Sequence, residues 1–183
     1  MLCSAFLFLN IMEIQENIVN KVAQSGLVTI DLAKYAPNEN EIYVYDIKDN
    51  LFHGLILREK DFRDFVKEHD WSQYQDKHIG IICSADAIIP TWAYMILANK
   101  LTPFAKSITF GDKDDIIKEQ FNQAINNIDY STFQDERIVV KGCGDIFVPE
   151  SAFVVFTSKL SVVAKSIMYG EPCSTVPVFK RKS

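Results

Sequence analysis

The chain repeats itself: residues 70–112 align without a gap with residues 129–171 when the sequence is shifted by 59 positions. The alignment holds 15 identities in 43 positions, whereas average composition would give about two or three by chance. Aromatic positions correspond as well, as Tyr94 does with Phe153. The identical residues of the first copy are Asp70, Ser72, Gln75, Asp76, Ile79, Asp86, Pro90, Ala93, Lys100, Leu101, Ala105, Lys106, Ser107, Ile108 and Gly111. A repeat of this length indicates that one supersecondary unit occurs twice, which limits the fold more than any other feature of the chain.

Each copy has the pattern of a βαβ unit. A short apolar run leads into a loop, a long apolar segment follows a proline, and a second apolar run ends at a glycine. Proline is favoured in the first turn of a helix, where its missing N–H would have had no partner. We therefore expect helices at residues 91–105 and 150–164, each crossing over between two parallel strands. The expected strands are residues 78–83, 106–110, 137–142 and 165–169.

Other segments add helices and strands to these units. Apolar residues at helical spacing predict an amphipathic helix ahead of each unit, at residues 59–69 and 115–127. The remaining expected elements are a helix at residues 14–24 and strands at residues 41–46, 51–57 and 175–180. Pro177 places the last strand at a sheet edge, because proline cannot donate a ladder hydrogen bond. Residues 12–183 are thus predicted to form a single α/β domain, in which internally duplicated βαβ units build a mainly parallel or mixed sheet with flanking helices.

The first eleven residues are a separate apolar stretch. They lack the basic start and the small-residue cleavage site of a signal peptide, and they are too short to span a bilayer. We interpret residues 1–11 as the product of a misassigned start, with Met12 as the initiator. On this interpretation Cys3 has no functional role.

Composition restricts the partners and the compartment. A net charge of -5 and a pI near 5.2 disfavour nucleic acid, because its phosphates would meet a repelling field. Four cysteines in a chain of 183 residues are typical of free thiols in a reducing compartment rather than of a disulfide scaffold. We therefore expect a cytoplasmic protein with no nucleic-acid and no membrane partner.

Cysteines occur where the expected strands end. Cys83 and Cys143 lie in the loops CSADAIIP and GCGDIFVP, one position out of alignment, and Cys173 follows the last strand of the second copy. Ligands of parallel sheets collect beyond the carboxyl ends of the strands. Thiolates with an added carboxylate or histidine suit zinc or an iron–sulfur cluster. We expect the three cysteines to bind such a metal, with Asp86 and Asp145 of the same loops as supporting or alternative ligands.

Other roles for these residues stay open. A free cysteine often packs as a small apolar side chain, or acts as a catalytic or redox thiol where a helix N-terminus lowers its pKa. His53 is retained as a further supporting or alternative ligand, because His69 and His78 fit solvated surface positions. Asp86 and Asp145 also have the spacing of residues that cap a turn before a helix.

Several stretches resemble a known family. The segments LILREKDFRDFVKEHDWSQYQ, CSADAIIPTWAYM, KGC and AKSIMYGEPCSTVPV are similar to a small bacterial family, domain-of-unknown-function family 2480. The resemblance extends from Ile18 to Lys180 and carries over no catalytic residues. Genes similar to this family often neighbour sulfur-mobilisation and iron–sulfur assembly genes. The resemblance therefore implies iron–sulfur assembly proteins as partners.

The sequence thus predicts a non-catalytic or accessory metal-binding protein that holds zinc or an iron–sulfur cluster and is linked to cluster assembly. One alternative is a metal-free small-anion binding protein or enzyme that uses the strand-end loops and the helix N-termini. Another is a protein–protein interaction scaffold, which predicts buried, unpaired cysteines and an exposed apolar patch. No residue pattern separates the two alternatives or identifies catalytic residues.

Overall fold

The structure is a computed structural model that describes residues 26–142, 144–171 and 173–182. Its α-helices are α1 (Glu59–Glu68), α2 (Thr91–Leu101), α3 (Lys113–Asn126) and α4 (Glu150–Val163). Its strands are β1 (Leu27–Asp31), β2 (Ile42–Asp46), β3 (His78–Ile82), β4 (Ser107–Phe110), β5 (Arg137–Lys141), β6 (Ser166–Glu171) and β7 (Ser174–Lys180). Single 3-10 turns are η1 (Leu32–Tyr35), η2 (Glu39–Glu41), η3 (Ile47–Asn50), η4 (Trp71–Tyr74) and η5 (Tyr130–Phe133).

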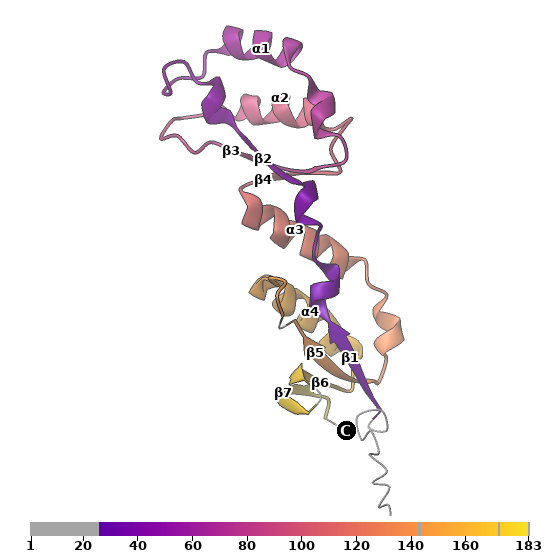
Figure 1. Cartoon of the computed structure of the whole chain (residues 1–183). Coiled ribbons are helices and arrows are strands. Elements are labelled where there is room, and N and C mark those ends of the chain that lie inside the picture. The colour runs from indigo at the N-terminus through magenta and orange to yellow at the C-terminus, as the bar shows by residue number, and fades with distance from the viewer. Residues whose placement is uncertain (1–25, 143, 172, 183) are drawn as a thin grey trace, which may run out of the picture.

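The strands form two sheets (Figure 1). Sheet A has the order β1-β5-β6-β7, and sheet B has the order β2-β3-β4. All strand pairs are parallel except β6 and β7, which run antiparallel at the edge of sheet A. The α/β class, the parallel strands within each unit and the last edge strand are therefore confirmed. The strands do not continue into one sheet, however, because each unit pairs with a separate strand from the start of the chain.

The chain builds sheet B between two passes through sheet A. The first strand, β1, pairs with β5, which comes much later in the sequence. The chain then crosses through η1 and η2 to β2, completes sheet B with β3 and β4, and returns to sheet A through α3. The segment that carries sheet B is thus inserted between the first strand of sheet A and the rest of that sheet.

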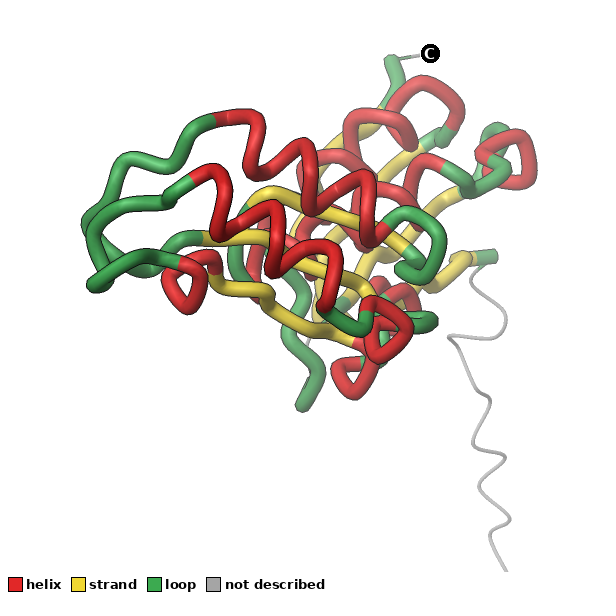
Figure 2. Tube along the Cα trace, turned by 90° about the horizontal axis from the view of Figure 1, so that it is seen from above, coloured by secondary structure: helices red, strands yellow, loops and turns green. Residues whose placement is uncertain are grey.

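Helices α1 and α2 cover one face of sheet B. In the view from above they are the two helices nearest the viewer and run side by side across the strands (Figure 2). Phe62 and Val66 of α1 and Ala93 and Leu97 of α2 are buried in one apolar core with Ile79 of β3. A spacing of four residues puts each helical pair on one face. Burial of a large apolar side chain stabilises a fold by about 1.5–3 kcal/mol.

Helix α3 packs against the strands of sheet B and against α4, and it lies between the two sheets (Figure 1). Ile116 in its first half is fully buried against Gly80 of β3, where an added Cβ would meet the Ile116 Cδ1 atom at 2.9 Å. Phe121 and Ile125 in its second half are fully buried in the core of sheet A. Asp112 caps the start of the helix by accepting hydrogen bonds from N–H groups of its first turn. This helix therefore belongs to the core of sheet A and also packs against sheet B through Ile116.

The two aligned segments have matching local structure. β3 and β5 begin 59 residues apart, and so do α2 and α4. Asp76 and Asp135 both have a φ of 60°, and the N–H of each donates to the carbonyl of a residue just past or at the end of the crossover helix. Asp70 and Asp129 each accept a hydrogen bond from the N–H of a serine two residues further on. These are similarities of geometry, and the duplication itself stays an interpretation of the sequence.

The prediction of a strand at residues 51–57 is wrong. This segment has only an isolated bridge, between Phe52 and Ile56, and otherwise forms turns. His53 and Gly54 have φ angles of 52° and 71°, which reverse the chain. Alternating apolar residues predict a strand only where the backbone stays extended, and that condition fails here.

The start of the chain gives a mixed result. Strand β1 was not expected, whereas the strand expected at residues 41–46 is confirmed as β2. The expected helix at residues 14–24 lies outside the described residues, as do residues 1–11 and Met12.

Candidate functional site

The carboxyl end of sheet A carries three linked charges. Asp31, Lys141 and Glu171 are the last residues of the neighbouring strands β1, β5 and β6. The Nζ atom of Lys141 lies 3.3 Å from Oε1 of Glu171 and 3.8 Å from Oδ2 of Asp31. Asp31 also accepts a hydrogen bond of 3.0 Å from the N–H of Ala33 in η1. The half-buried Lys141 thus links the ends of β1, β5 and β6 through its two ion pairs.

An open groove of about 770 Å³ lies beside this edge, between α4, β6 and β7. Val140 and Ile167 of the sheet, Phe153 and Val154 of α4, and Val178 of β7 are among its lining residues. Val154 and Val178 remain 68% and 53% exposed. The groove forms because α4 packs over β5 and β6 and leaves β7 uncovered on that face, so apolar side chains are presented to solvent.

A close approach between a strand end and α4 shapes the groove. An added Cβ at Gly142 would meet the Cζ atom of Phe153 at 2.7 Å, so a side chain there would require the Phe153 ring to shift. The ring of Phe153 packs edge-on against Tyr169, with the ring centroids 5.7 Å apart. Glu150 is the charged residue among the described lining residues. Gly142 and Glu150 flank the loop that contains Cys143, so the groove ends beside this loop.

The two described cysteines lie on different sheets. Cys83 follows β3 of sheet B, is half-buried against the apolar core, and donates to the carbonyl of Ala85 at 3.6 Å. Cys173 is exposed in the turn between β6 and β7 of sheet A. Cys143 and Cys3 lie outside the described residues. Within the part of the chain that the structure describes, no three His, Cys, Asp or Glu residues are grouped to hold a metal. The three-thiol site therefore stays a prediction.

The supporting ligands are spread over the surface. Asp86, Asp145 and His53 are all exposed. Asp145 borders a separate hollow together with Asn38. The ring of His53 packs against Phe52, with centroids 4.0 Å apart, in the bend after η3. The capping role that the spacing of Asp86 suggested is not seen among the hydrogen bonds of the described residues.

The carboxyl end of sheet B has its own carboxylate, Asp46. It accepts hydrogen bonds from the N–H groups of Lys48 and Ser84, both at 3.0 Å, and from the Ser84 hydroxyl at 2.5 Å. Burial opposes ionisation of Asp46, but the hydrogen bonds from Ser84 and Lys48 outweigh it and lower its pKa to about 2. Asp46 thereby ties the end of β2 to the loop after β3. At the 59-residue offset, the counterpart of Ser84 is Cys143.

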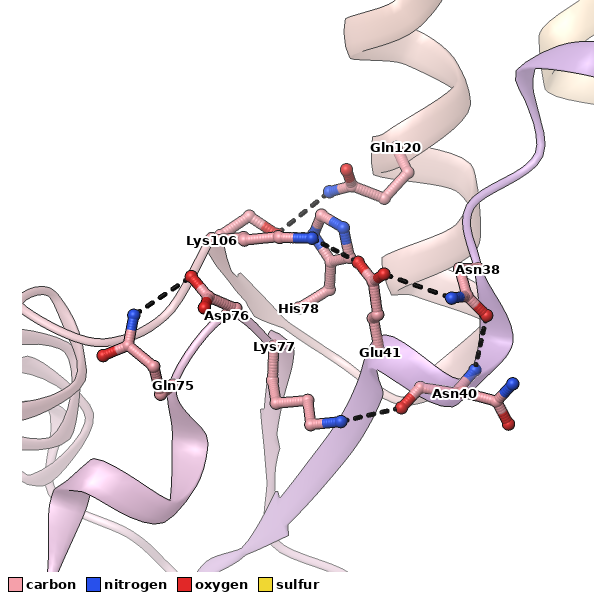
Figure 3. Close-up of polar contacts among 10 residues, drawn as sticks. Asn38, Asn40, Glu41, Gln75, Asp76, Lys77, His78, Lys106 and Gln120 are labelled. Carbon is pink, nitrogen blue, oxygen red and sulfur yellow. Dashed lines mark hydrogen bonds and ion pairs between the residues drawn. The ribbon is translucent and has the colours of Figure 1, made fainter.

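A polar cluster lies at the opposite, amino end of sheet B (Figure 3). Gln120 of α3 donates to the Ser107 hydroxyl at 3.0 Å, and this hydroxyl is 2.8 Å from Nδ1 of His78. Lys106 binds the carboxylate of Glu41 beside them. Burial and the neighbouring Lys106 lower the pKa of His78. Ligands of parallel sheets bind at the other end of the strands. We therefore interpret the cluster as a brace that joins β3 and β4 to α3.

The sequence did not lead us to the groove. Helices α2 and α4 are apolar on most faces, a pattern typical of buried helices. Only one face of each is buried, however, and Met95 of α2 and Val154 of α4 stay 67% and 68% exposed. An apolar surface wider than the face that packs on the sheet was the available signal, because such surface needs either a second covering layer or a ligand.

The fold and the site define an α/β protein in which a parallel sheet and a mixed sheet share one helix, with an open apolar groove on the mixed sheet. The chain belongs to the family described as "Protein of unknown function (DUF2480)", whose model matches residues 16–181. The family resemblance seen in the motifs is therefore confirmed. No curated protein and no solved structure matches the chain. Among the described residues, none of the helices has the length and apolar character needed to cross a membrane.

Proposed function

We propose that the protein is a non-catalytic binding protein that docks an apolar segment of a partner protein in the groove between α4 and β7. The observation that carries this proposal is the exposed apolar lining. Val154, Val176 and Val178 remain 68%, 62% and 53% exposed in or beside the cavity. Contiguous exposed apolar surface marks interaction sites, because covering it gains about 25 cal/mol per Å².

The lining also indicates the chemistry of the partner. Val178 of β7 lines the cavity and the exposed Val176 lies two residues before it on the same strand, so the apolar surface follows a strand and suits an extended segment with apolar side chains. Glu150 borders one end of the groove and forms no ion pair with another described residue. A partner segment with a lysine or arginine at that end would pair with this carboxylate. We infer an extended apolar segment with a basic residue at one end.

Two synthetic peptides test this inference. Both alternate valine and serine, and one begins with arginine where the other begins with glutamate. We expect the arginine peptide to shift the NMR resonances of Val154 and Tyr169. It should bind about tenfold more tightly than the glutamate peptide, a difference of about 1.4 kcal/mol. Glu150→Lys should reverse this preference.

Two matched variants serve as the control. Val154→Lys places a charge in the groove, whereas Met95→Lys places one at the corresponding position of α2, which is equally exposed at 67%. Binding should be lost in the first variant and kept in the second. If both variants bind the peptide equally well, the groove is not the docking site.

Metal binding at the end of the groove is a second candidate function, with zinc or an iron–sulfur cluster held by an accessory of cluster assembly. Strands β5 and β6 are neighbours, and the ion pair of Lys141 with Glu171 joins the residues two positions before Cys143 and Cys173. Asp31 adds a carboxylate to the same edge. Thiolates and carboxylates are ligands that zinc takes, which supports this second proposal.

The proposal of a metal site is tested by measuring the metal, iron and labile-sulfide content of protein purified without oxygen. We expect stoichiometric metal, lost in Cys143→Ser and in Cys173→Ser. Retention in Cys83→Ser would indicate a site confined to sheet A, whereas loss in all three variants would support the three-thiol site. Metal-free protein, with unchanged stability in Cys143→Ser, would contradict both metal sites and leave the groove proposal in place.

A further inference from the structure

Sheet B ends at an open edge formed by β4. In sheet A, β7 flanks the outer side of β6, whereas no strand among the described residues pairs with the outer side of β4. The two strands are counterparts, since β4 lies in KSITFGD and β6 lies in KSIMYGE. Phe110 of β4 is 75% exposed, and its ring packs edge-on against Tyr94 with the centroids 5.3 Å apart. The edge therefore offers a strand partner both backbone groups and an apolar side chain.

The orientation of the backbone groups follows from the pairing with β3. The N–H of Gly111 donates to the carbonyl of Ile81, so Gly111 faces β3. Successive residues of a strand turn their N–H and C=O groups to opposite sides. Ile108 and Phe110 therefore turn these groups away from β3, toward the open edge. In sheet A, the counterparts of these two residues are paired with β7 in the antiparallel direction.

We propose that β4 pairs antiparallel with β4 of a second copy of the chain, forming a dimer with a twofold axis beside Thr109. In this register Ile108 of each copy bonds to Phe110 of the other. The dimer joins two three-stranded sheets B into one continuous sheet. An antiparallel pair of identical strands satisfies the requirement of a closed dimer that both copies use the same surface. The proposal is independent of the groove, which lies on sheet A.

Charge and hydrogen bonding favour a second copy over an unrelated strand. In the proposed register the exposed Lys106 of each copy, which also binds Glu41, faces the exposed Asp112 of the other, which also caps α3. Opposite charges directly across an antiparallel pair are stabilising. Thr109 of one copy faces Thr109 of the other. The buried Oγ1 atom of Thr109 has no hydrogen-bond partner among the described residues. A threonine pair across the axis can supply that partner after rotation about χ1.

Sedimentation and light scattering of the full chain test the dimer. We expect a dimer for the wild-type chain and for Met95→Lys, and a monomer for Phe110→Lys. Phe110 is mostly exposed, so this variant should fold, which circular dichroism checks. A wild-type chain that is monomeric from micromolar to millimolar concentration would overturn the proposal. So would a Phe110→Lys variant that remains a dimer.

Disulfide crosslinking tests the register separately. In the proposed dimer the two Thr109 Cα atoms form a non-hydrogen-bonded pair about 4.5 Å apart, which a disulfide can span. The two Phe110 residues are displaced along the strands by about 7 Å, which places their Cα atoms beyond disulfide reach. Under mild oxidation with oxidised glutathione, Thr109→Cys should crosslink into dimers much faster than Phe110→Cys or the parent chain. Equal rates for the two variants would rule out this register.

Discussion

Single side chains fix the strand ends, and Asp46 is the clearest case. Its carboxylate accepts hydrogen bonds from Lys48 and from both the N–H and the hydroxyl of Ser84. An asparagine has one accepting oxygen and cannot replace all of these bonds. We expect Asp46→Asn to lower the free energy of unfolding by about 1 kcal/mol near neutral pH, measured by urea denaturation. Asp49→Asn, an exposed change in the adjacent η3, should remain within about 0.5 kcal/mol of wild type.

The carboxylate of Asp46 also makes the stability of the fold depend on pH in the acidic range. The folded-state pKa of Asp46 is about 2, below the ordinary value of 3.8. A lowered folded pKa gives stability that is present above the ordinary value and lost as the pH falls toward the folded value. The difference between wild type and Asp46→Asn should therefore shrink between about pH 4 and pH 2. A difference that stays constant over this window would show that the carboxylate is not ionised in the fold.

His78 should make the stability of the fold depend on pH in a higher range than Asp46 does. Burial and the adjacent Lys106 lower its folded pKa from the ordinary value of 6.5, against the opposing influence of Glu41. The unfolded chain then binds more protons than the native chain as the pH falls below about 6.5, so acid destabilises the fold there. His78→Gln should lose less stability than wild type between pH 7.5 and pH 5 in urea denaturation.

At the scale of elements, periodic patterns were sufficient where packing is local. The apolar spacing predicted amphipathic helices at residues 59–69 and 115–127, which α1 and α3 confirm, and their apolar residues Phe62 and Phe121 are buried. The segment at residues 51–57 was misjudged because the bend at His53 is a backbone property that its neighbours do not signal. The groove could not be predicted in the same way, since it depends on how far α4 extends over the sheet.

The packing of α3 on sheet B depends on a glycine. A side chain at Gly80 would meet the carbonyl of Gly111 and the Cδ1 atom of Ile116 at 2.9 Å. Both neighbours are fixed, one by the backbone and one by full burial, so α3 would have to shift. We expect Gly80→Ala to lower the free energy of unfolding by about 1–3 kcal/mol. Gly144→Ala, where an added Cβ meets nothing within 4 Å, is the control; equal effects of the two changes would contradict this account.

At the scale of the whole molecule, the repeat predicted the content of each unit but not the division into two sheets. The same sequence pattern would result whether the two copies formed one continuous sheet or two separate sheets. The contacts that decide between these arrangements are made by β1 and α3. The prediction of the metal site has the same limit. Cys83 and Cys173 each follow a strand of a repeated unit, yet the fold puts them on different sheets, and spacing alone does not contain that information.

The shared helix α3 leads to a prediction for the unfolding of the whole chain. Both tryptophans, Trp71 and Trp92, belong to the core of sheet B, whereas Phe156 is fully buried in the core of sheet A. Because α3 belongs to the core of sheet A and also packs against the strands of sheet B, loss of the sheet A core should destabilise sheet B. Phe156→Ala should cost about 3–5 kcal/mol and should shift the urea transition seen by tryptophan fluorescence as much as that seen by far-ultraviolet circular dichroism. Val162→Ala, an exposed change on the same helix at 75%, should shift neither. An unchanged fluorescence transition beside a biphasic dichroism transition would mean that the two sheets unfold independently and that α3 does not couple them.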